Sequence, residues 1–138
     1  MDTPQSFHED LVLPYRGVVG AGFQSPAQDY VETSVNLSKL LLRRKAASFF
    51  VSVQGISMAP NINDGDYLLV DNSIRPGHGD IVIADVEGAI TVKRLYKRDQ
   101  FVSLQPDNTD FSPIFLDSEN SADIWGVVTA IIRIACLR

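Results

Sequence analysis

The sequence has a single cysteine, Cys136, so no disulfide can form within the chain. Nothing in its composition therefore indicates an oxidising compartment. Cys136 lies in an apolar stretch near the C-terminus, where packing is a commoner role for a cysteine than nucleophilic attack. Residues 1–20 contain three acidic residues and lack the apolar core of a signal peptide. We therefore expect a cytoplasmic protein.

Long apolar runs and positive charge are also scarce. The longest largely apolar stretch runs from Ile124 to Ile132 and contains Thr129, whereas a membrane span needs about 20 apolar residues. No membrane attachment is expected. The chain has 12 Lys and Arg residues against 17 Asp and Glu residues, a net charge of −5. Because phosphate contacts need clustered positive charge, direct sequence-specific DNA binding is not expected.

What is present is an ordinary globular composition. A chain of 138 residues with 45% hydrophobic and 21% charged residues is typical of one folded domain. The first 24 residues carry several prolines and glycines and show weak periodicity, which predicts an extended, mobile arm over 1–24. The remaining residues, 25–138, are assigned to a single domain.

Two short helices are predicted at the start of that domain. A capping box with a proline at the first helical position starts one helix at Ser25, and we expect it to run to about Ser34. Asn36 caps a second helix that should bury one leucine-lined face. That face would consist of Leu37, Leu40 and Leu41.

After Lys45 the sequence is dominated by β-branched and aromatic runs separated by turn signals. Six strands are predicted, at 48–54, 67–70, 80–86, 89–97, 101–105 and 124–137. The dipeptide Glu87-Gly88 is placed to join two of them as a hairpin. The predicted fold class is therefore mainly β, with a compact and mostly antiparallel domain.

Ser57 is the first candidate for chemistry, in the segment Gly55-Ile56-Ser57-Met58-Ala59-Pro60. It follows a predicted strand, and Pro60 prevents continuation as regular sheet, so a turn should present its hydroxyl. Gly55 allows a ligand close to the backbone, and the N–H groups of Ile56 and Ser57 are candidates to stabilise an oxyanion. A serine in such a turn also has a common structural role, which this segment alone does not exclude.

A serine nucleophile needs a base, and the chain has only two histidines. His8 lies in the predicted arm and His78 lies between two glycines, so neither is a good partner. A lysine can act instead if burial keeps it neutral. Lys93 is the candidate. In its predicted strand it shares a face with Thr91 and Leu95, while Val92 and Arg94 share the other, so neither face is cleanly core or solvent. The alternative is a solvated lysine on a strand edge.

The protonation state of the amine decides whether Lys93 can act as a base. With the ordinary lysine pKa of about 10.4, only about one molecule in 2500 is neutral at pH 7. Desolvation can lower this pKa by about 3 to 5 units. A buried Lys93 could then accept the Ser57 proton.

Through these segments and others, the sequence resembles the LexA/UmuD family of self-cleaving serine/lysine peptidases, and in particular its UmuD-like branch. The resemblance covers the chain from Ala21 onward. Besides the Ser57 segment, the matching runs are Ala21-Gly22-Phe23, Ser25-Pro26-Ala27, Asp29-Tyr30-Val31-Glu32, Asp64-Gly65-Asp66, His78-Gly79-Asp80-Ile81-Val82, Thr91-Val92-Lys93-Arg94-Leu95 and Trp125-Gly126-Val127-Val128. The resemblance implies a LexA-like peptidase domain in which Ser57 is the nucleophile and Lys93 the general base.

The resemblance also implies where the chain is cut. Ser57 would attack the carbonyl of Ala21, and the Ala21-Gly22 bond would break through an acyl-enzyme. Small residues suit this site because they let an extended segment enter a narrow cleft. Cleavage within one chain and cleavage between two chains both remain compatible with the sequence. Removal of residues 1–21 would change the net charge from −5 to −3, which creates no basic DNA-binding surface.

Partners are implied by the resemblance alone. Cleavage would be stimulated by the RecA filament on single-stranded DNA during the SOS response to DNA damage. The shortened homodimer would then act as accessory subunit of a UmuC-like error-prone DNA polymerase in translesion synthesis. No cofactor and no metal are expected.

Three alternatives share part of this pattern. A LexA-like repressor fragment would need a DNA-binding domain, and few residues precede the first predicted helix. A non-catalytic interaction module of the same fold would be unaffected by Ser57→Ala. A signal-peptidase-like enzyme would need a membrane segment.

Overall fold

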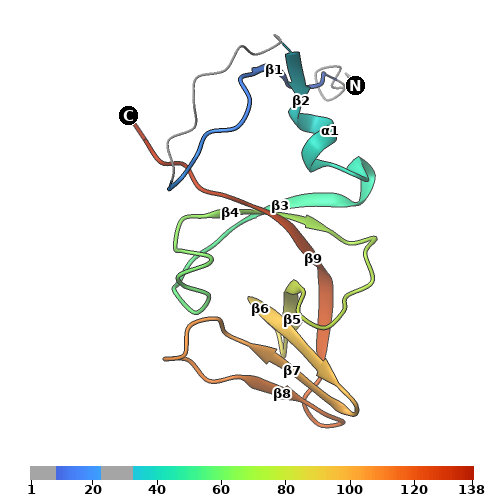
Figure 1. Ribbon diagram of the computed structural model, residues 1–138. Coiled ribbons are helices and arrows are strands. Elements are labelled where there is room, and N and C mark those ends of the chain that lie inside the picture. Colours follow the sequence, from blue (N-terminus) through green and yellow to red (C-terminus); the bar gives the residue numbers. More distant parts are fainter. Residues whose placement is uncertain (1–8, 23–32) are drawn as a thin grey trace. The chain divides into compact units, whose positions relative to one another are not determined.

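The computed structural model describes residues 9–22 and 33–138 (Figure 1). The chain divides into one unit of residues 1–43 and a second of residues 44–138. The domain boundary that the sequence predicts after Gln24 lies outside the described residues and stays a prediction. Among the described residues, no helix has the length and apolar character that crossing a membrane requires.

The first unit contains a small antiparallel pair of strands. β1 (Val12–Tyr15) pairs with β2 (Thr33–Asn36), and α1 (Leu37–Leu41) follows directly. β1 lies inside the predicted arm, where the sequence analysis assigned no strand. The strand was not predicted because it contains Pro14. A proline lacks a backbone N–H donor and is found in strands mainly at edge positions.

Asn36 caps α1 as predicted. Its Oδ1 accepts a hydrogen bond from the backbone N of Lys39 at 3.1 Å, and its Nδ2 donates to Asp10 Oδ2 at 2.8 Å. The predicted buried leucine face is wrong, because Leu40 is 67% exposed and Leu41 is 37% exposed. A helix of five residues is too short to cover a continuous face.

The helix predicted from Ser25 falls mostly outside the described residues. Its predicted end is wrong, because Thr33 and Ser34 belong to β2. Thr33 and Val35 are β-branched residues, which favour an extended backbone, and the pairing with β1 adds the hydrogen bonds of a ladder.

Seven antiparallel strands form the sheet of the second unit, in the order β3-β4-β9-β5-β6-β7-β8. Their bounds are β3 (Ser48–Ser52), β4 (Tyr67–Asp71), β5 (Ile81–Val86), β6 (Ala89–Arg98), β7 (Phe101–Gln105), β8 (Ile114–Leu116) and β9 (Ala122–Ile132), and the 3-10 turn η2 (Lys45–Ala47) precedes β3. The long strand β9 pairs with both β4 and β5 and so joins the two halves of the sheet (Figure 1). The predicted mainly β fold is confirmed.

All six predicted strands are present, with differences at their ends. The strand at 101–105 has the predicted bounds, whereas the last strand ends at Ile132 and the predicted extension to Leu137 is wrong. β8 was missed because it is only three residues long. The hairpin at Glu87-Gly88 is confirmed, with φ of 52° and 88°, both positive as a tight two-residue turn requires.

Two apolar clusters hold the sheet together. One contains Met58, Ile62, Leu68, Val70 and Ile83, and the other contains Val82, Ala84, Leu95, Leu104 and Val127. Adjacent residues of β5 point to opposite faces, so Val82 and Ile83 enter different clusters. Met58 and Ile62 come from the loop after β3, and burial of such a side chain contributes about 1.5–3 kcal/mol. This burial anchors the segment that follows Ser57.

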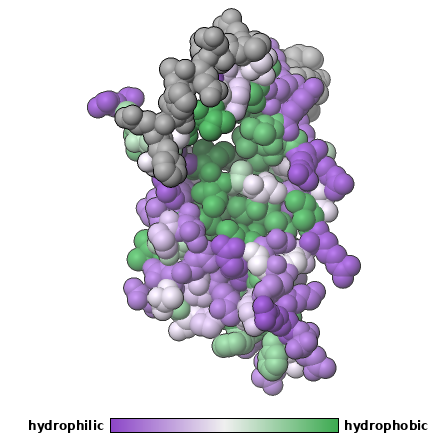
Figure 2. All heavy atoms as spheres, in the orientation of Figure 1, coloured by the Kyte–Doolittle hydropathy of each residue, from purple (hydrophilic) through white to green (hydrophobic). Residues whose placement is uncertain are grey.

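Some large apolar side chains remain outside these clusters. Figure 2 shows such side chains gathered over the region of β3 and β4. On these strands Phe50 is 54% exposed and Tyr67 is 36% exposed, and their rings stack with centroids 5.5 Å apart. A stacked pair of this kind stabilises neighbouring strands by about 0.5–1.5 kcal/mol beyond its burial.

A buried carboxylate holds the turn between β3 and β4. Asp66 is 2% exposed and accepts hydrogen bonds from the backbone N of Asn63 at 2.8 Å and from Arg133 at 2.8 and 2.6 Å. The Arg133 hydrogen bonds hold the pKa of Asp66 below its ordinary value. The backbone of Asp66 in turn accepts a hydrogen bond from the N of Val53. The backbone just before the Ser57 turn is therefore hydrogen-bonded to a residue that is itself held in place.

We predict that Gly126→Ala destabilises the fold. A Cβ at this buried position of β9 would lie 2.7 Å from Val70 Cγ1 and 3.0 Å from Asp71 O, and overpacking of this kind costs about 1–3 kcal/mol. Urea denaturation measures the loss. Gly77→Ala is the matched control, because its Cβ would lie 3.7 Å from Asp80 Oδ2 and should change stability by less than about 0.5 kcal/mol. Equal stability of the two variants would contradict the prediction.

Candidate active site

Ser57 lies in a tight turn between β3 and β4. Gly55 has a φ of 103°, a conformation that other residues rarely adopt, and its N–H donates to Asp64 Oδ1 at 2.7 Å. The chain therefore changes direction just before Ser57. Met58, directly after it, is 1% exposed and belongs to the first apolar cluster. Ser57 is thus held between a glycine turn and a core residue.

Lys93 reaches Ser57 from β6. Its Nζ donates to Ser57 Oγ at 3.0 Å, to Thr91 Oγ1 at 2.6 Å and to the carbonyl of Val92 at 3.1 Å. Thr91 and Lys93 lie on one face of the strand, as the sequence predicts. Lys93 is 8% exposed, so it is not a solvated edge lysine. The structure brings the two residues together; their catalytic roles stay a prediction.

Burial lowers the pKa of the Lys93 amine, since its charged form loses hydration. The three acceptors around the amine are neutral oxygens, and none of them is a carboxylate that would favour the charged form. A neutral amine keeps two N–H donors, enough for Thr91 and Val92, and turns its lone pair to the Ser57 hydroxyl. The arrangement can therefore take a proton from that hydroxyl.

A cleft of about 430 Å³ opens beside Ser57. Its walls come from β3, the Ser57 turn, β4, β5 and the first half of β6, and they combine apolar and polar groups. The apolar side chains include Val51, Val53, Met58, Leu68, Ile90 and Val92, and the polar ones are Ser52, Gln54, Ser57 and Thr91. β3 lies at the edge of the sheet, so one side of its backbone is available to an extended segment.

Ala21 and Gly22, the predicted cut site, belong to the first unit, whereas Ser57 and Lys93 belong to the second. Both lie in a bend after β1 and are exposed. Two apolar residues precede them, Val18 and Val19, which are 86% and 89% exposed. The predicted cut site is therefore accessible and preceded by unburied valines.

Sequence reasoning missed a loop that contacts the Ser57 turn. It joins β7 to β8, and its Asn108 donates from Nδ2 to Ile56 O and from its backbone N to Ser57 O, both at 3.0 Å. The backbone N of Asp107 donates to Met58 Sδ at 3.3 Å. The only local signal was a run of turn-forming residues after a strand, which says nothing of its partners.

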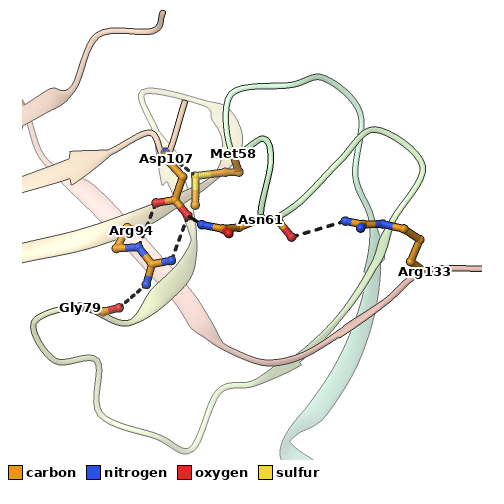
Figure 3. Close-up of polar contacts among 6 residues, drawn as sticks. All are labelled: Met58, Asn61, Gly79, Arg94, Asp107 and Arg133. Carbon is orange, nitrogen blue, oxygen red and sulfur yellow. Dashed lines mark hydrogen bonds and ion pairs between the residues drawn. The ribbon is translucent and has the colours of Figure 1, made fainter. Parts of the chain in front are cut away.

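The same loop is attached to β6 by an ion pair (Figure 3). Asp107 accepts hydrogen bonds from Arg94 Nε and Nη2, both at 2.9 Å, and from Asn61 Nδ2 at 2.8 Å. Arg94 also donates from Nη1 to Gly79 O at 2.8 Å. The Arg94 hydrogen bonds hold the pKa of Asp107 below its ordinary value, and the Asn61 bond acts in the same direction.

Comparison with known proteins identifies the family. The family model described as Peptidase S24-like matches residues 14–129. The chain belongs to this family. The matched span includes Ala21, Gly22, Ser57 and Lys93, and so covers every residue that the sequence analysis assigned to the site.

Three relatives show how far the S24-like similarity extends. Protein MucA of Salmonella typhimurium is 44% identical over 113 residues, which cover 80% of this chain and 77% of MucA. Protein ImpA of Shigella flexneri is 44% identical over 116 residues, which cover 82% of this chain and 77% of ImpA. The LexA repressor of Psychromonas ingrahamii is 40% identical over 130 residues, which cover 93% of this chain but 61% of LexA.

These similarities make the chain a UmuD-like member of the LexA/UmuD group of S24-like peptidases. The match spans more of MucA and ImpA than of the longer LexA repressor. The resemblance found in the sequence is therefore confirmed at the level of the family.

We predict that the amine of Lys93 titrates below the ordinary pKa of lysine. Burial disfavours the charged form, so the amine loses its proton at a lower pH than an exposed lysine would. NMR of protein with 13C-labelled lysine, with Lys93→Arg to assign the signal, measures the titration. Ser57→Ala should leave the shift in place, because it preserves the burial. A titration midpoint at the ordinary lysine value would contradict the prediction.

Proposed function

We propose that this S24-like chain is a self-cleaving serine peptidase with Ser57 as nucleophile and Lys93 as general base. The observation that carries the proposal is the 3.0 Å contact between Lys93 Nζ and Ser57 Oγ, made by a lysine that is 8% exposed. The neutral amine takes the hydroxyl proton as the oxygen attacks and then returns it to the leaving amine. Membership of a peptidase family supports this assignment.

The proposed substrate is the chain's own Ala21-Gly22 bond. Attack of Ser57 on the carbonyl of Ala21 gives a tetrahedral intermediate, and its collapse breaks the bond to the Gly22 nitrogen. The fragment up to Ala21 then remains as an ester on Ser57 until water releases it. The apolar side chains that line part of the cleft suit the exposed Val18 and Val19, and the position of β3 at the edge of the described sheet suits an extended segment.

The N–H groups of Ile56 and Ser57 are the proposed oxyanion donors. The support for Ser57 is the orientation of the Ile56-Ser57 peptide group. Its carbonyl accepts a hydrogen bond from Asn108, and in a trans peptide group the N–H points away from the carbonyl. The Ser57 N–H therefore points away from Asn108.

We further propose a UmuD-like role in the SOS response. The RecA filament on single-stranded DNA would stimulate cleavage, and the shortened homodimer would join a UmuC-like error-prone polymerase in the cytoplasm. Similarity to MucA, ImpA and LexA supports this role. Removal of residues 1–21 leaves a net charge of −3, which favours a protein partner over direct binding to DNA.

Ser57→Ala and Lys93→Arg should each abolish the fragment that begins at Gly22. The first variant lacks the nucleophile, and the second replaces the base by a group that stays protonated. We expect a fall in rate of at least about 1000-fold. Intact-mass measurement after alkaline incubation of the full chain checks this. The exposed residues of Ser118→Ala and Lys97→Arg provide matched controls, which should be cut like the wild type. A Gly22 fragment from Ser57→Ala would overturn the dyad.

The activated RecA filament should raise the rate at which the Gly22 fragment forms at neutral pH. Intact-mass time courses with filament, with free RecA and with single-stranded DNA alone measure the stimulation. Lys93→Arg should give no fragment under any of these conditions, because the filament acts through the dyad. An equal rate with and without the filament would contradict the SOS role and leave the dyad untouched.

A further inference from the structure

The turn that carries Ser57 is held by contacts from a distant segment. Three consecutive residues of the turn, Ile56, Ser57 and Met58, each accept a hydrogen bond from the loop between β7 and β8. The donors are two consecutive residues of that loop, Asp107 and Asn108. Because the turn is not part of the sheet, these contacts help to set the orientation of its peptide groups.

The direction of these hydrogen bonds matters for the chemistry. In a trans peptide group, the carbonyl and the N–H point to opposite sides. With the carbonyls of Ile56 and Ser57 held by Asn108, the N–H groups of Ser57 and Met58 turn away from the loop. Ser57 and Met58 line the cleft together with β3 and β6. The loop thus holds the turn by its carbonyls and leaves the N–H of Ser57, one of the two proposed oxyanion donors, free to face a substrate.

The loop is in turn fixed to the strand that carries Lys93. Arg94 follows Lys93 in β6 and points to the opposite face, where it forms the two-pronged ion pair with Asp107 (Figure 3). Asp107 also binds Asn61, which lies just beyond the Ser57 turn. One strand therefore supports both members of the dyad: Lys93 directly, and Ser57 through Arg94, Asp107 and Asn108.

The exposure of its two side chains indicates that the Arg94–Asp107 ion pair positions the loop more than it stabilises the whole fold. The side chain of Arg94 is 37% exposed, whereas that of Asp107 is 10% exposed. A pair that is partly in water adds little to global stability. Its two parallel hydrogen bonds nevertheless fix the direction of the loop, because both groups are planar.

We propose that Asn108 is a positioning residue for the nucleophile and that the Arg94–Asp107 ion pair holds the loop of Asn108 at a fixed position relative to Lys93. The proposal rests on the self-cleavage proposed above. Without the side-chain hydrogen bond from Asn108 to the carbonyl of Ile56, the Ser57 oxygen leaves the line between the lysine amine and the carbonyl under attack. A misplacement of about 1 Å reduces such a rate by about 100-fold.

The test uses the full chain and follows the Gly22 fragment by intact mass. Asn108→Ala removes the Nδ2 donor, and Asn108→Asp keeps the shape but places a carboxylate against the carbonyl of Ile56. We expect both to be cut about 10- to 100-fold more slowly than the wild type. Arg94→Lys keeps the charge but loses the two-pronged geometry, so a smaller fall of about 3- to 10-fold is expected. Asn72→Ala, whose exposed side chain makes no hydrogen bond within the described residues, is the matched control.

Two readouts separate positioning from a general loss of folding. The pH profile of cleavage should keep its midpoint in the Asn108 variants, because the contacts of Lys93 are intact, while the rate falls at every pH. Labelling of Ser57 by a fluorophosphonate should slow in parallel, since it needs the nucleophile but not the cut site. Both effects should persist well below the melting temperature. A deficit that disappears on cooling would overturn the proposal.

The outcomes also separate this inference from the proposed function. A Gly22 fragment that still forms in Ser57→Ala overturns both, because the nucleophile would then be another group. Cleavage that needs Ser57 but runs at the wild-type rate in both Asn108 variants overturns only the role of Asn108. If Asn108→Ala fails to fold, the isosteric Asn108→Asp decides the question by the same measurements.

Discussion

The removal of one lysine amine from water is the constraint on which the site depends. Lys93 pairs with Val82 across β5 and β6, and Val82 is part of the second apolar cluster. The lysine side chain is 8% exposed, and this burial lowers the pKa of its amine. The neighbours are neutral oxygens, which can bind the neutral amine as well as the charged one. A carboxylate in the same place would favour the ammonium and remove the base.

Charged groups are present near the site, but neither of the two ion pairs described above contacts the Lys93 amine. Arg133 with Asp66 fixes the turn that ties down the end of β3, and Arg94 with Asp107 fixes the loop that grips the Ser57 turn. Both pairs satisfy their charges within themselves. The ion pairs therefore help to set the position of Ser57 and Lys93, while the side-chain and backbone groups bonded to the Lys93 amine are neutral oxygens. Because neither ion pair contacts the Lys93 amine, burial is what lowers its pKa.

The sequence could predict what is determined locally. The period of two placed Thr91 and Lys93 on one face, and the cap at Asn36 was evident from its position before an apolar run. β1 and β8 were not predictable, because one contains Pro14 and the other is three residues long. The contacts of Asn108 could not be predicted either. They join residues 51 and 52 positions apart, and no local pattern encodes such a pairing.

All the groups described around the dyad lie in residues 44–138. This one unit contains the Lys93 amine, its acceptors, the glycine turn, the loop between β7 and β8 and both ion pairs. Loss of residues 1–21 would take away none of them. A chain cut once at the proposed site would therefore keep every group of the proposed dyad, so its self-cleavage would end because its own scissile bond is gone and not because these groups are damaged.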